Sequence, residues 1–339
     1  MSCTTIISCF SYTGNKKYIF NVKYLRSDLR RILSFSHNQI GCSLSNIYVM
    51  SDIQPSEIIQ NQILNDFCSE VIKYLKELGL FFGVYKGISI NHLKKIKMTP
   101  TQWLLNLCNK LISSKKATNL YREIMRTILP VIRTSNVIEF ASLFTNLILI
   151  NGKSHYDDVL NTIFNKPTSN LFFYYTGHGI KIWKHANSSS HEICLIIPGS
   201  NQIVDYYTQK ELQNRFELIL KTVPSFIVFD CCHGQNLLNF PNSSLKSIYL
   251  SSTSNNQTCG FYIPESGSLF TYYMMQFLNK SNIKSLSELQ VVETQIQKYR
   301  TSTKKKPQNM SIILSDDTMT DFPSWLFQGL KNQLIEEDD

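Results

Sequence analysis

Short runs of apolar residues alternate along the chain with longer segments in which apolar residues recur every three to four positions. The first pattern is typical of buried strands, and the second is typical of helices that pack on a sheet. Residues 146–150 fit either a strand or the end of a preceding helix. Strands are expected at residues 4–10, 46–50, 171–176, 226–230, 247–250 and 311–314. Helices are expected at residues 24–35, 155–164, 207–221, 269–278 and 287–299, and a polar loop at 179–190.

This alternation predicts an α/β fold with a mostly parallel sheet of about six strands, covered by helices on both faces. Residues 55–134 follow a different pattern, in which long helical periodicity predicts three or four helices. We expect this block either to pack as a separate helical subdomain or to thicken one helical layer of the sheet. The predicted organisation is a main domain of residues 1–54 and 135–325, a helical insertion at 55–134 and a C-terminal tail at 326–339.

Composition and charge narrow the classes of protein to consider. The 339 residues carry a net charge of +9, which favours anionic partners. The lysine-rich runs at 94–97 and 304–306 lack interleaved aromatic residues, however, and no nucleic-acid-binding module is present, so specific nucleic-acid binding is not expected. The chain has no signal-peptide pattern at its start, and its longest apolar run is too short to cross a bilayer, so no membrane association is expected.

The cysteines indicate a reducing compartment. There are nine of them, an odd number, and no two are spaced as a CxxC pair. Several lie in apolar runs, as free buried thiols do in reducing compartments. We therefore expect a cytoplasmic protein without a disulfide framework or a zinc knuckle.

Two of the predicted strands end in polar turns that carry reactive side chains. Residues 171–179 read LFFYYTGHG, and residues 226–234 read FIVFDCCHG. Functional groups collect beyond the carboxyl ends of strands in α/β sheets, so neighbouring strands would bring His178 beside Cys232. A histidine that accepts the proton of a thiol makes the sulfur a nucleophile. The backbone N–H groups of Gly179 and Cys232 would then face the developing oxyanion.

Each of these residues also has a plainer interpretation. A single histidine or a single buried cysteine is more often structural than catalytic. Cys231, Cys232 and His233 also suggest a metal site that would draw on His191 and Cys194. Adjacent residues of an extended chain point to opposite faces, and the spacing matches no familiar metal site, so a metal is not expected. Two reactive turns at the ends of two strands together favour catalysis.

The two turns resemble the signature segments of the metacaspases, which belong to the caspase-like cysteine peptidases. That family usually carries Tyr-Ser-Gly-His-Gly and Asp-Xaa-Cys-His-Ser-Gly, and further likeness lies in residues 24–29, 251–257 and 267–271. The resemblance covers residues 1–52 and 138–314. It implies a three-layer α/β/α sandwich, a catalytic dyad of His178 and Cys232, no cofactor, and a role in proteolysis and programmed cell death.

The resemblance also implies a choice of substrate. Metacaspases use acidic groups to bind the basic residue before the cut, and the matching positions here are Asp28, Thr176 and Asp230. Two carboxylates that face a guanidinium form charge-assisted hydrogen bonds. The expected substrates are therefore proteins or peptides with Arg or Lys at the cleavage site. Animal caspases select Asp instead and carry a Gln-Ala-Cys segment, which this chain lacks.

The chain departs from the family pattern in three respects. Gly234 and Gln235 stand where the family usually has Ser-Gly. Residues 180–190 lack the aspartates of calcium-activated metacaspases, so no calcium requirement is expected. The interval between residues 232 and 247 is too short for a long cleavable linker, so a single unprocessed chain is expected. The altered loop keeps a second hypothesis open, a catalytically weak or inactive interaction module that binds partners through the helical insertion. The sequence sets no oligomeric state.

Overall fold

The computed structural model describes most of the predicted main domain. The chain divides into two compact units, residues 1–53 with 144–339 and residues 54–143, and every described residue belongs to the first. The predicted insertion at 55–134 and the end of the predicted tail lie outside the described residues, so the domain bounds stay a prediction. The described residues are 2–12, 15, 17–19, 22–53, 146–183, 191–239, 245–254, 257, 259, 262–263, 267–279 and 285–328.

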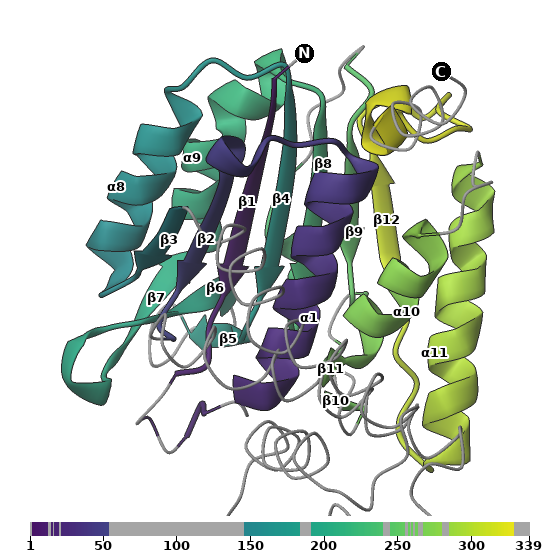
Figure 1. Ribbon diagram of the computed structural model, residues 1–339. Coiled ribbons are helices and arrows are strands. Elements are labelled where there is room, and N and C mark those ends of the chain that lie inside the picture. Colours follow the sequence, from purple (N-terminus) through teal and green to yellow (C-terminus); the bar gives the residue numbers. More distant parts are fainter. Residues whose placement is uncertain are drawn as a thin grey trace, which may run out of the picture. The chain divides into compact units, whose positions relative to one another are not determined.

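A seven-stranded sheet lies at the centre of the described unit, in the order β12-β9-β8-β4-β1-β2-β3 (Figure 1). Six strands run parallel, and β12 pairs antiparallel with β9. This confirms the mostly parallel sheet, with one strand more than expected, and shows that the residues after 145 form a strand. The strands are β1 (Cys3–Cys9), β2 (Ile47–Ser51), β3 (Asn146–Leu149), β4 (Asn170–Thr176), β8 (Ser225–Asp230), β9 (Ile248–Ser251) and β12 (Ser311–Leu314).

Helices cover both faces of this sheet (Figure 1). Rings of adjacent residues on β4 show the two interfaces. Phe173 meets Phe216 of α9 with ring centroids 4.9 Å apart, whereas Phe172 meets Phe35, which follows α1, at 5.6 Å. The predicted three-layer α/β/α arrangement is confirmed. One face carries α8 (Lys153–Phe164) and α9 (Gln209–Thr222), and the other carries α1 (Val22–Ser34) and α10 (Leu269–Leu278), with α11 (Gln290–Ser302) packed against α10.

A second sheet corrects the first part of the polar loop predicted at 179–190: residues 179–183 form a strand, and residues 184–190 lie outside the described residues. Its three antiparallel strands are β5 (Gly179–Trp183), β6 (His191–Pro198) and β7 (Val204–Thr208). Apolar Ile180 and Ile182 alternate with other residues along β5, and this period of two is the strand signal that the prediction missed. The helix predicted from residue 207 begins later, at Gln209, because Thr208 caps it in a capping box with Glu211.

A short antiparallel ribbon leads into α10. It joins β10 (Tyr262–Ile263) to β11 (Gly267–Ser268), and α10 follows directly. The ribbon lies at the end of the central sheet where the parallel strands finish (Figure 1). That end is therefore where the turns after β4 and β8 and the start of α10 come together.

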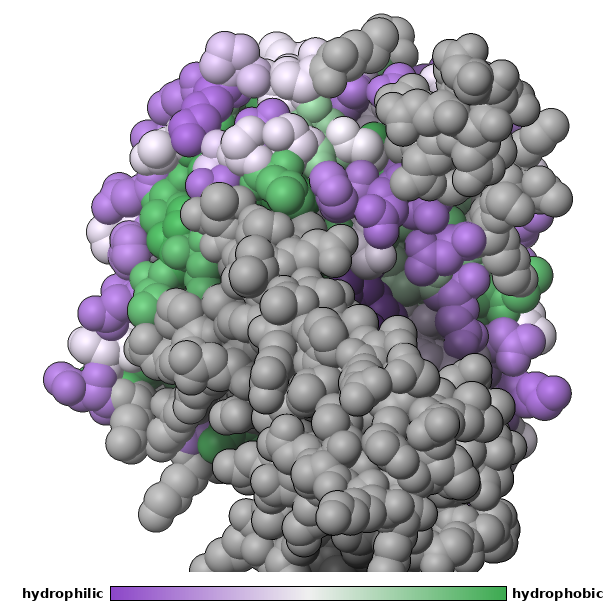
Figure 2. All heavy atoms as spheres, in the orientation of Figure 1, coloured by the Kyte–Doolittle hydropathy of each residue, from purple (hydrophilic) through white to green (hydrophobic). Residues whose placement is uncertain are grey.

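Apolar and polar side chains are unevenly distributed over the described surface. Figure 2 shows apolar residues gathered over the edge strand β3, where Leu149 is partly exposed, and hydrophilic residues toward α10 and α11. None of the described helices combines the length and the apolar character that crossing a bilayer requires.

Candidate active site

The turns that follow β4 and β8 are in direct contact. The two strands pair in parallel, with Thr176 opposite Asp230, so both chains leave the sheet at the same edge. A Cβ placed on Gly179 would lie only 2.0 Å from the carbonyl oxygen of Cys232. A side chain at position 179 would therefore force the two turns apart, which explains why glycine is required there.

Within the second turn, the two adjacent cysteines have opposite surroundings. Cys231 is fully buried, and burial raises the pKa of its thiol well above the ordinary value. Cys232 is partly exposed, and a hydrogen bond with Cys259 lowers the pKa of its thiol. The accessible and more easily ionised sulfur is therefore that of Cys232.

The first turn fixes the imidazole of His178 through its backbone and its ring. The backbone N–H donates to the hydroxyl of Tyr12 at 3.0 Å, and ring atom Nε2 lies 2.8 Å from the carbonyl oxygen of Tyr18. A carbonyl only accepts hydrogen bonds, so Nε2 carries the proton and the lone pair of the neutral ring is on Nδ1. Burial lowers the pKa of His178, which favours this neutral form.

Tyrosine hydroxyls lock the backbone of the same turn. The hydroxyl of Tyr175 donates to the carbonyl oxygens of His178 and Ile196, and the hydroxyl of Tyr12 also donates to Ile196. A Cβ on Gly177 would lie 2.6 Å from the Tyr12 hydroxyl oxygen. Close packing therefore requires a glycine on both sides of His178, at Gly177 against Tyr12 and at Gly179 against Cys232.

The strand pairing also sets the direction of the Gly179 amide. Ile196 N donates to His178 O at 3.0 Å, so residues 178 and 196 stand at a hydrogen-bonding position of the β5–β6 register, although the N–H of His178 itself donates to Tyr12. Gly179 and Leu195 are the next pair along the ladder and therefore a non-hydrogen-bonded pair. The residues of a non-hydrogen-bonded pair direct their N–H groups away from the partner strand. The N–H of Gly179 is thus directed away from β6.

The predicted substrate-binding residues come together beside these turns. Cys9, Thr176 and Asp230 pair across β1, β4 and β8 and form one row at the end of the sheet. Asp28 of α1 lies close to this row, since Asp28 and Asp230 are both hydrogen-bonded by residues at the start of α10. Thr176, Asp230 and Asp28 are all buried.

The two carboxylates are held by the start of α10. Both oxygens of Asp28 accept the backbone N–H of Ser268, at 3.0 and 2.9 Å, and Asp230 accepts the hydroxyl of Thr271 at 2.6 Å. Burial raises the pKa of both groups, and the charge of Asp230 raises that of Asp28 further. Arg31, with a guanidinium nitrogen 3.7 Å from Asp28, partly offsets these effects. The pair would therefore be stabilised by a further cation.

The loop after Cys232 accommodates the departures from the family pattern. His233 adopts a left-handed conformation (φ 58°), and its N–H donates to the carbonyl oxygen of Gln257 at 3.2 Å. The N–H of Gly234 donates to the Thr253 hydroxyl at 3.1 Å. Thr253 and Gln257, which follow β9, thus support the backbone directly after Cys232.

Three contributions to this site were missed from the sequence. The Tyr18 carbonyl is a backbone group, so no side-chain pattern reveals it. The sulfur of Cys259 lies 3.6 Å from that of Cys232, but an isolated cysteine in the sequence shows no partner. Ser268 and Thr271 lie in the segment 267–271 that resembles the family, and this likeness was the available signal.

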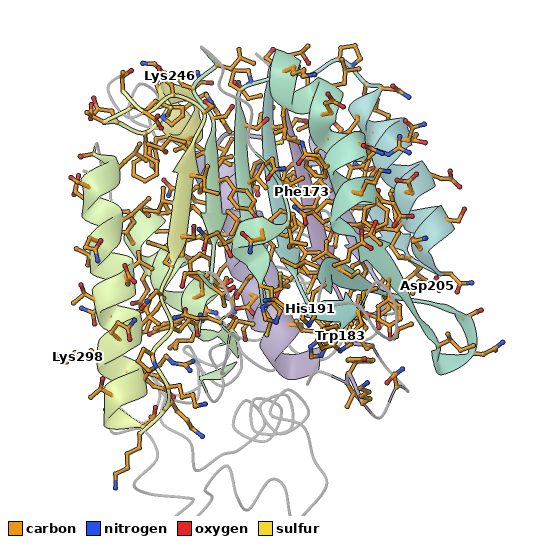
Figure 3. The ribbon with its side chains drawn as sticks, turned by 180° about the vertical axis from the view of Figure 1, so that it is seen from behind. Phe173, Trp183, His191, Asp205, Lys246 and Lys298 are labelled. Atoms are coloured by element: carbon orange, nitrogen blue, oxygen red, sulfur yellow. The ribbon has the colours of Figure 1, made fainter. Side chains whose placement is uncertain are left out.

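The alternative metal ligands do not gather at the site. His191 packs against Trp183 across the β5–β6 hairpin, with ring centroids 3.8 Å apart and the ring planes tilted by 38° (Figure 3), and Cys194 is buried. Among the described residues, no group of three or more histidine, cysteine or acidic side chains is placed to hold a metal ion.

Comparison with known proteins adds evidence on the family. The family model described as "Caspase domain" matches residues 145–319, about half of the chain. Metacaspase-5 of Trypanosoma cruzi (strain CL Brener) is 34% identical over 83 residues, which are 22% of this chain and 17% of that protein. The matched region thus spans less than one fifth of that relative.

Two solved structures also have a backbone similar to that of this chain. Caspase-1 from Spodoptera frugiperda has a TM-score of 0.41 and 9% identity, covering 93% of this chain and 87% of that one. A structural genomics target from Geobacter sulfurreducens has a TM-score of 0.39 and 11% identity, covering 54% of this chain and 80% of that one. The family model over residues 145–319 confirms the predicted caspase-like character.

Proposed function

Because this chain belongs to the caspase domain family, we propose that it is a cysteine endopeptidase that cuts proteins and peptides after arginine or lysine. One observation carries the proposal: the turn that holds His178 touches the turn that exposes Cys232. The backbones of the two turns that carry the reactive groups are thus in contact. The cysteine has a lowered pKa, and the histidine a fixed orientation.

In the first step, the thiol of Cys232 gives its proton to Nδ1 of His178, and the sulfur attacks the peptide carbonyl carbon. A carbon–sulfur bond forms, and the carbonyl oxygen becomes an oxyanion. The imidazolium then returns the proton to the amide nitrogen as the carbon–nitrogen bond breaks. The amine leaves, and an acyl group remains on the sulfur. Water, deprotonated by His178, attacks the acyl carbon and releases the acid together with the thiol.

Backbone amides would stabilise the oxyanion. The N–H of Gly179 is directed away from β6, and the N–H of Cys232 belongs to the turn against which Gly179 packs. Removing one such donor typically costs about 3 kcal/mol of transition-state stabilisation. Gly179 therefore serves twice, as the close contact that brings the turns together and as a donor.

The acidic pair would bind the side chain before the cut. Asp28 and Asp230 carry raised pKa values because they are buried, and the charge of Asp230 raises the pKa of Asp28 further. A substrate guanidinium or ammonium would bring the missing positive charge and would form charge-assisted hydrogen bonds. Thr176, between Cys9 and Asp230 in the same row, would complete the floor of this pocket.

The test is cleavage of fluorogenic peptides that end in Arg, Lys or Asp, with the full-length chain and a chelator present. Turnover of the Arg and Lys peptides is expected without calcium. Cys232→Ala and His178→Ala should abolish it. Cys231→Ala is the matched control, because it removes the buried neighbouring thiol and should keep the activity.

The outcomes separate the parts of the proposal. Equal turnover by Cys232→Ala would reject the nucleophile, and preference for Asp peptides would reject the pocket while leaving the dyad. A folded chain that cuts none of the peptides would instead favour the interaction module.

A further inference from the structure

The sulfur atom of Cys232 has a second sulfur in contact with it. The Sγ atoms of Cys232 and Cys259 lie 3.6 Å apart, and the Cys232 thiol is also 3.8 Å from the carbonyl oxygen of Cys259. Both cysteines are free. A disulfide bond is about 2.05 Å long, so the two atoms are at contact distance and need a further approach of roughly 1.5 Å to bond.

Hydrogen bonds hold the segment before Cys259 against the nucleophile. Gln257 accepts the N–H of His233 with its carbonyl and donates its own N–H to Ser254, each at 3.2 Å. Its side-chain oxygen accepts the N–H of Asn309 at 2.8 Å. The residue two positions before Cys259 is thus tied to the residue directly after Cys232, which keeps the two sulfurs together.

These two thiols differ from the other described cysteines in their exposure. Cys232 and Cys259 are partly exposed, while the other five described cysteines are buried. Cys42 also contacts another cysteine, since its thiol donates to the carbonyl oxygen of Cys3 at 2.9 Å, but both of these residues are buried. Oxidation of cysteine follows thiolate character and access, so Cys232 is the described thiol expected to react first.

We propose that Cys232 and Cys259 form a reversible disulfide when the protein meets a peroxide, with Cys259 as the resolving cysteine. The sulfur of Cys232 attacks one oxygen of hydrogen peroxide, the O–O bond breaks, and one water leaves as a sulfenic acid forms. The sulfur of Cys259 then attacks the oxidised sulfur, the S–O bond breaks, and a second water leaves. Two thiols and one peroxide thus give one disulfide and two waters. A dithiol reductant reverses the change through a mixed disulfide.

The disulfide would act on the proposed peptidase as a reversible block, and this consequence rests on the proposed function. A sulfur in a disulfide cannot attack a peptide carbonyl. Fast capture of the sulfenic acid by Cys259 would also prevent its oxidation to the sulfinic acid, which is irreversible except by dedicated repair. The pair would therefore both switch the site off and protect it.

The experiment treats the reduced full-length chain with one equivalent of hydrogen peroxide and maps the products by mass spectrometry without reduction. The expected result is the loss of two hydrogens from the intact mass and a peptide that links Cys232 to Cys259, with activity lost and then recovered with dithiothreitol. Cys259→Ala should instead gain one oxygen atom and label with dimedone, and when excess peroxide carries it to the sulfinic acid it should recover little of its own starting activity with dithiothreitol. Cys42→Ser is the matched control and should form the same link as the unmodified chain.

The link is measured without reference to catalysis, so the two proposals fail separately. A link between Cys232 and Cys259 in a chain that cuts no peptide would keep the redox pair and reject the peptidase. An active chain whose Cys232 is oxidised without this link, or is linked to another cysteine, would overturn the redox pair. If Cys259→Ala does not fold, the peptide map of the unmodified chain still decides.

Discussion

Two groups of acidic side chains in the described part of the chain differ in their partners. On the outer side of α8 and α9, Asp157 accepts hydrogen bonds from Arg215 and Tyr207, and Lys153 pairs with Glu211 at 2.9 Å. At the end of the central sheet, Asp28 and Asp230 are buried near each other, with the Arg31 guanidinium 3.7 Å from Asp28.

The pKa values of the two clusters move in opposite directions. Burial opposes ionisation of Asp157, but the hydrogen bonds from Arg215 and Tyr207 outweigh it and lower its pKa. At Asp28 and Asp230, burial is the largest effect and raises the pKa. An acid whose partners are supplied by the fold serves stability, whereas acids that are buried together at reduced ionisation are suited to bind a cation.

The largest expected effect breaks the acidic pair. Asp230→Asn should lower kcat/KM for Arg-ended peptides by roughly 10- to 150-fold, because one hydrogen bond to a charged group contributes about 1.5–3 kcal/mol. The measurement is steady-state turnover of the peptide series. Asp157→Asn is the matched control and should leave kcat/KM unchanged, so an equal loss in both variants would remove the distinction between the clusters.

A pH series sharpens the comparison through the raised pKa values. The pair must be ionised to bind a cationic side chain, so KM for Arg peptides should rise as the pH falls through the raised pKa of Asp230 and Asp28. The ordinary value of 3.8 would place this rise too low to observe in a folded enzyme, so its appearance at higher pH reports the shift. A KM that is flat with pH for Arg peptides would argue against the pair as the pocket.

A smaller effect is expected on stability. Asp157→Ala removes the acceptor of both Arg215 and Tyr207 and should lower the free energy of unfolding by about 1 kcal/mol. Thermal unfolding should show Tm lower by about 2–4 °C in a domain of this size. Asp230→Asn is not expected to lose stability in this way at neutral pH, since it removes a buried charge that has no close cation among its principal partners.

The smallest effect is the pH dependence of stability, where the two clusters have opposite signs. Asp157, with its lowered pKa, contributes stability that is present above pH 3.8 and lost as the pH falls through its folded value. Asp230, with its raised pKa, binds more protons when folded, so stability decreases as the pH rises from 3.8 toward its folded value. Urea midpoints at several pH values should show Asp157→Asn flattening the first change and Asp230→Asn the second. Equal slopes in both variants would contradict this assignment.

The catalytic side of the molecule could be predicted where a strand and a turn lie together in sequence. The buried strands β4 and β8 read as apolar runs, and the reactive residues follow them directly, so their neighbourhood could be inferred from the parallel sheet rule. Helix α10 was also predicted with the bounds that it has, 269–278, because apolar and aromatic residues fill most of this segment.

The parts that could not be predicted depend on groups far apart in the chain or common to every residue. The carbonyl of Tyr18 orients His178, and every residue carries a carbonyl. The contact of Cys259 with Cys232 joins residues 27 positions apart, and no local sequence pattern indicates it. The polar residues around β5 favour a loop by composition, whereas the apolar residues at every second position of β5 indicate the strand that the structure shows.

The dependence of the acidic pair on the start of α10 has a consequence for biosynthesis. Ser268, the hydrogen-bond partner of Asp28, is synthesised 240 positions after it. A nascent chain in which only the turns after β4 and β8 have left the ribosome therefore still lacks the groups of α10 that hydrogen-bond Asp28 and Asp230. In the proposed peptidase, selective cleavage would begin only when translation has passed α10, so unfinished copies would be poor proteases toward their neighbours in the polysome.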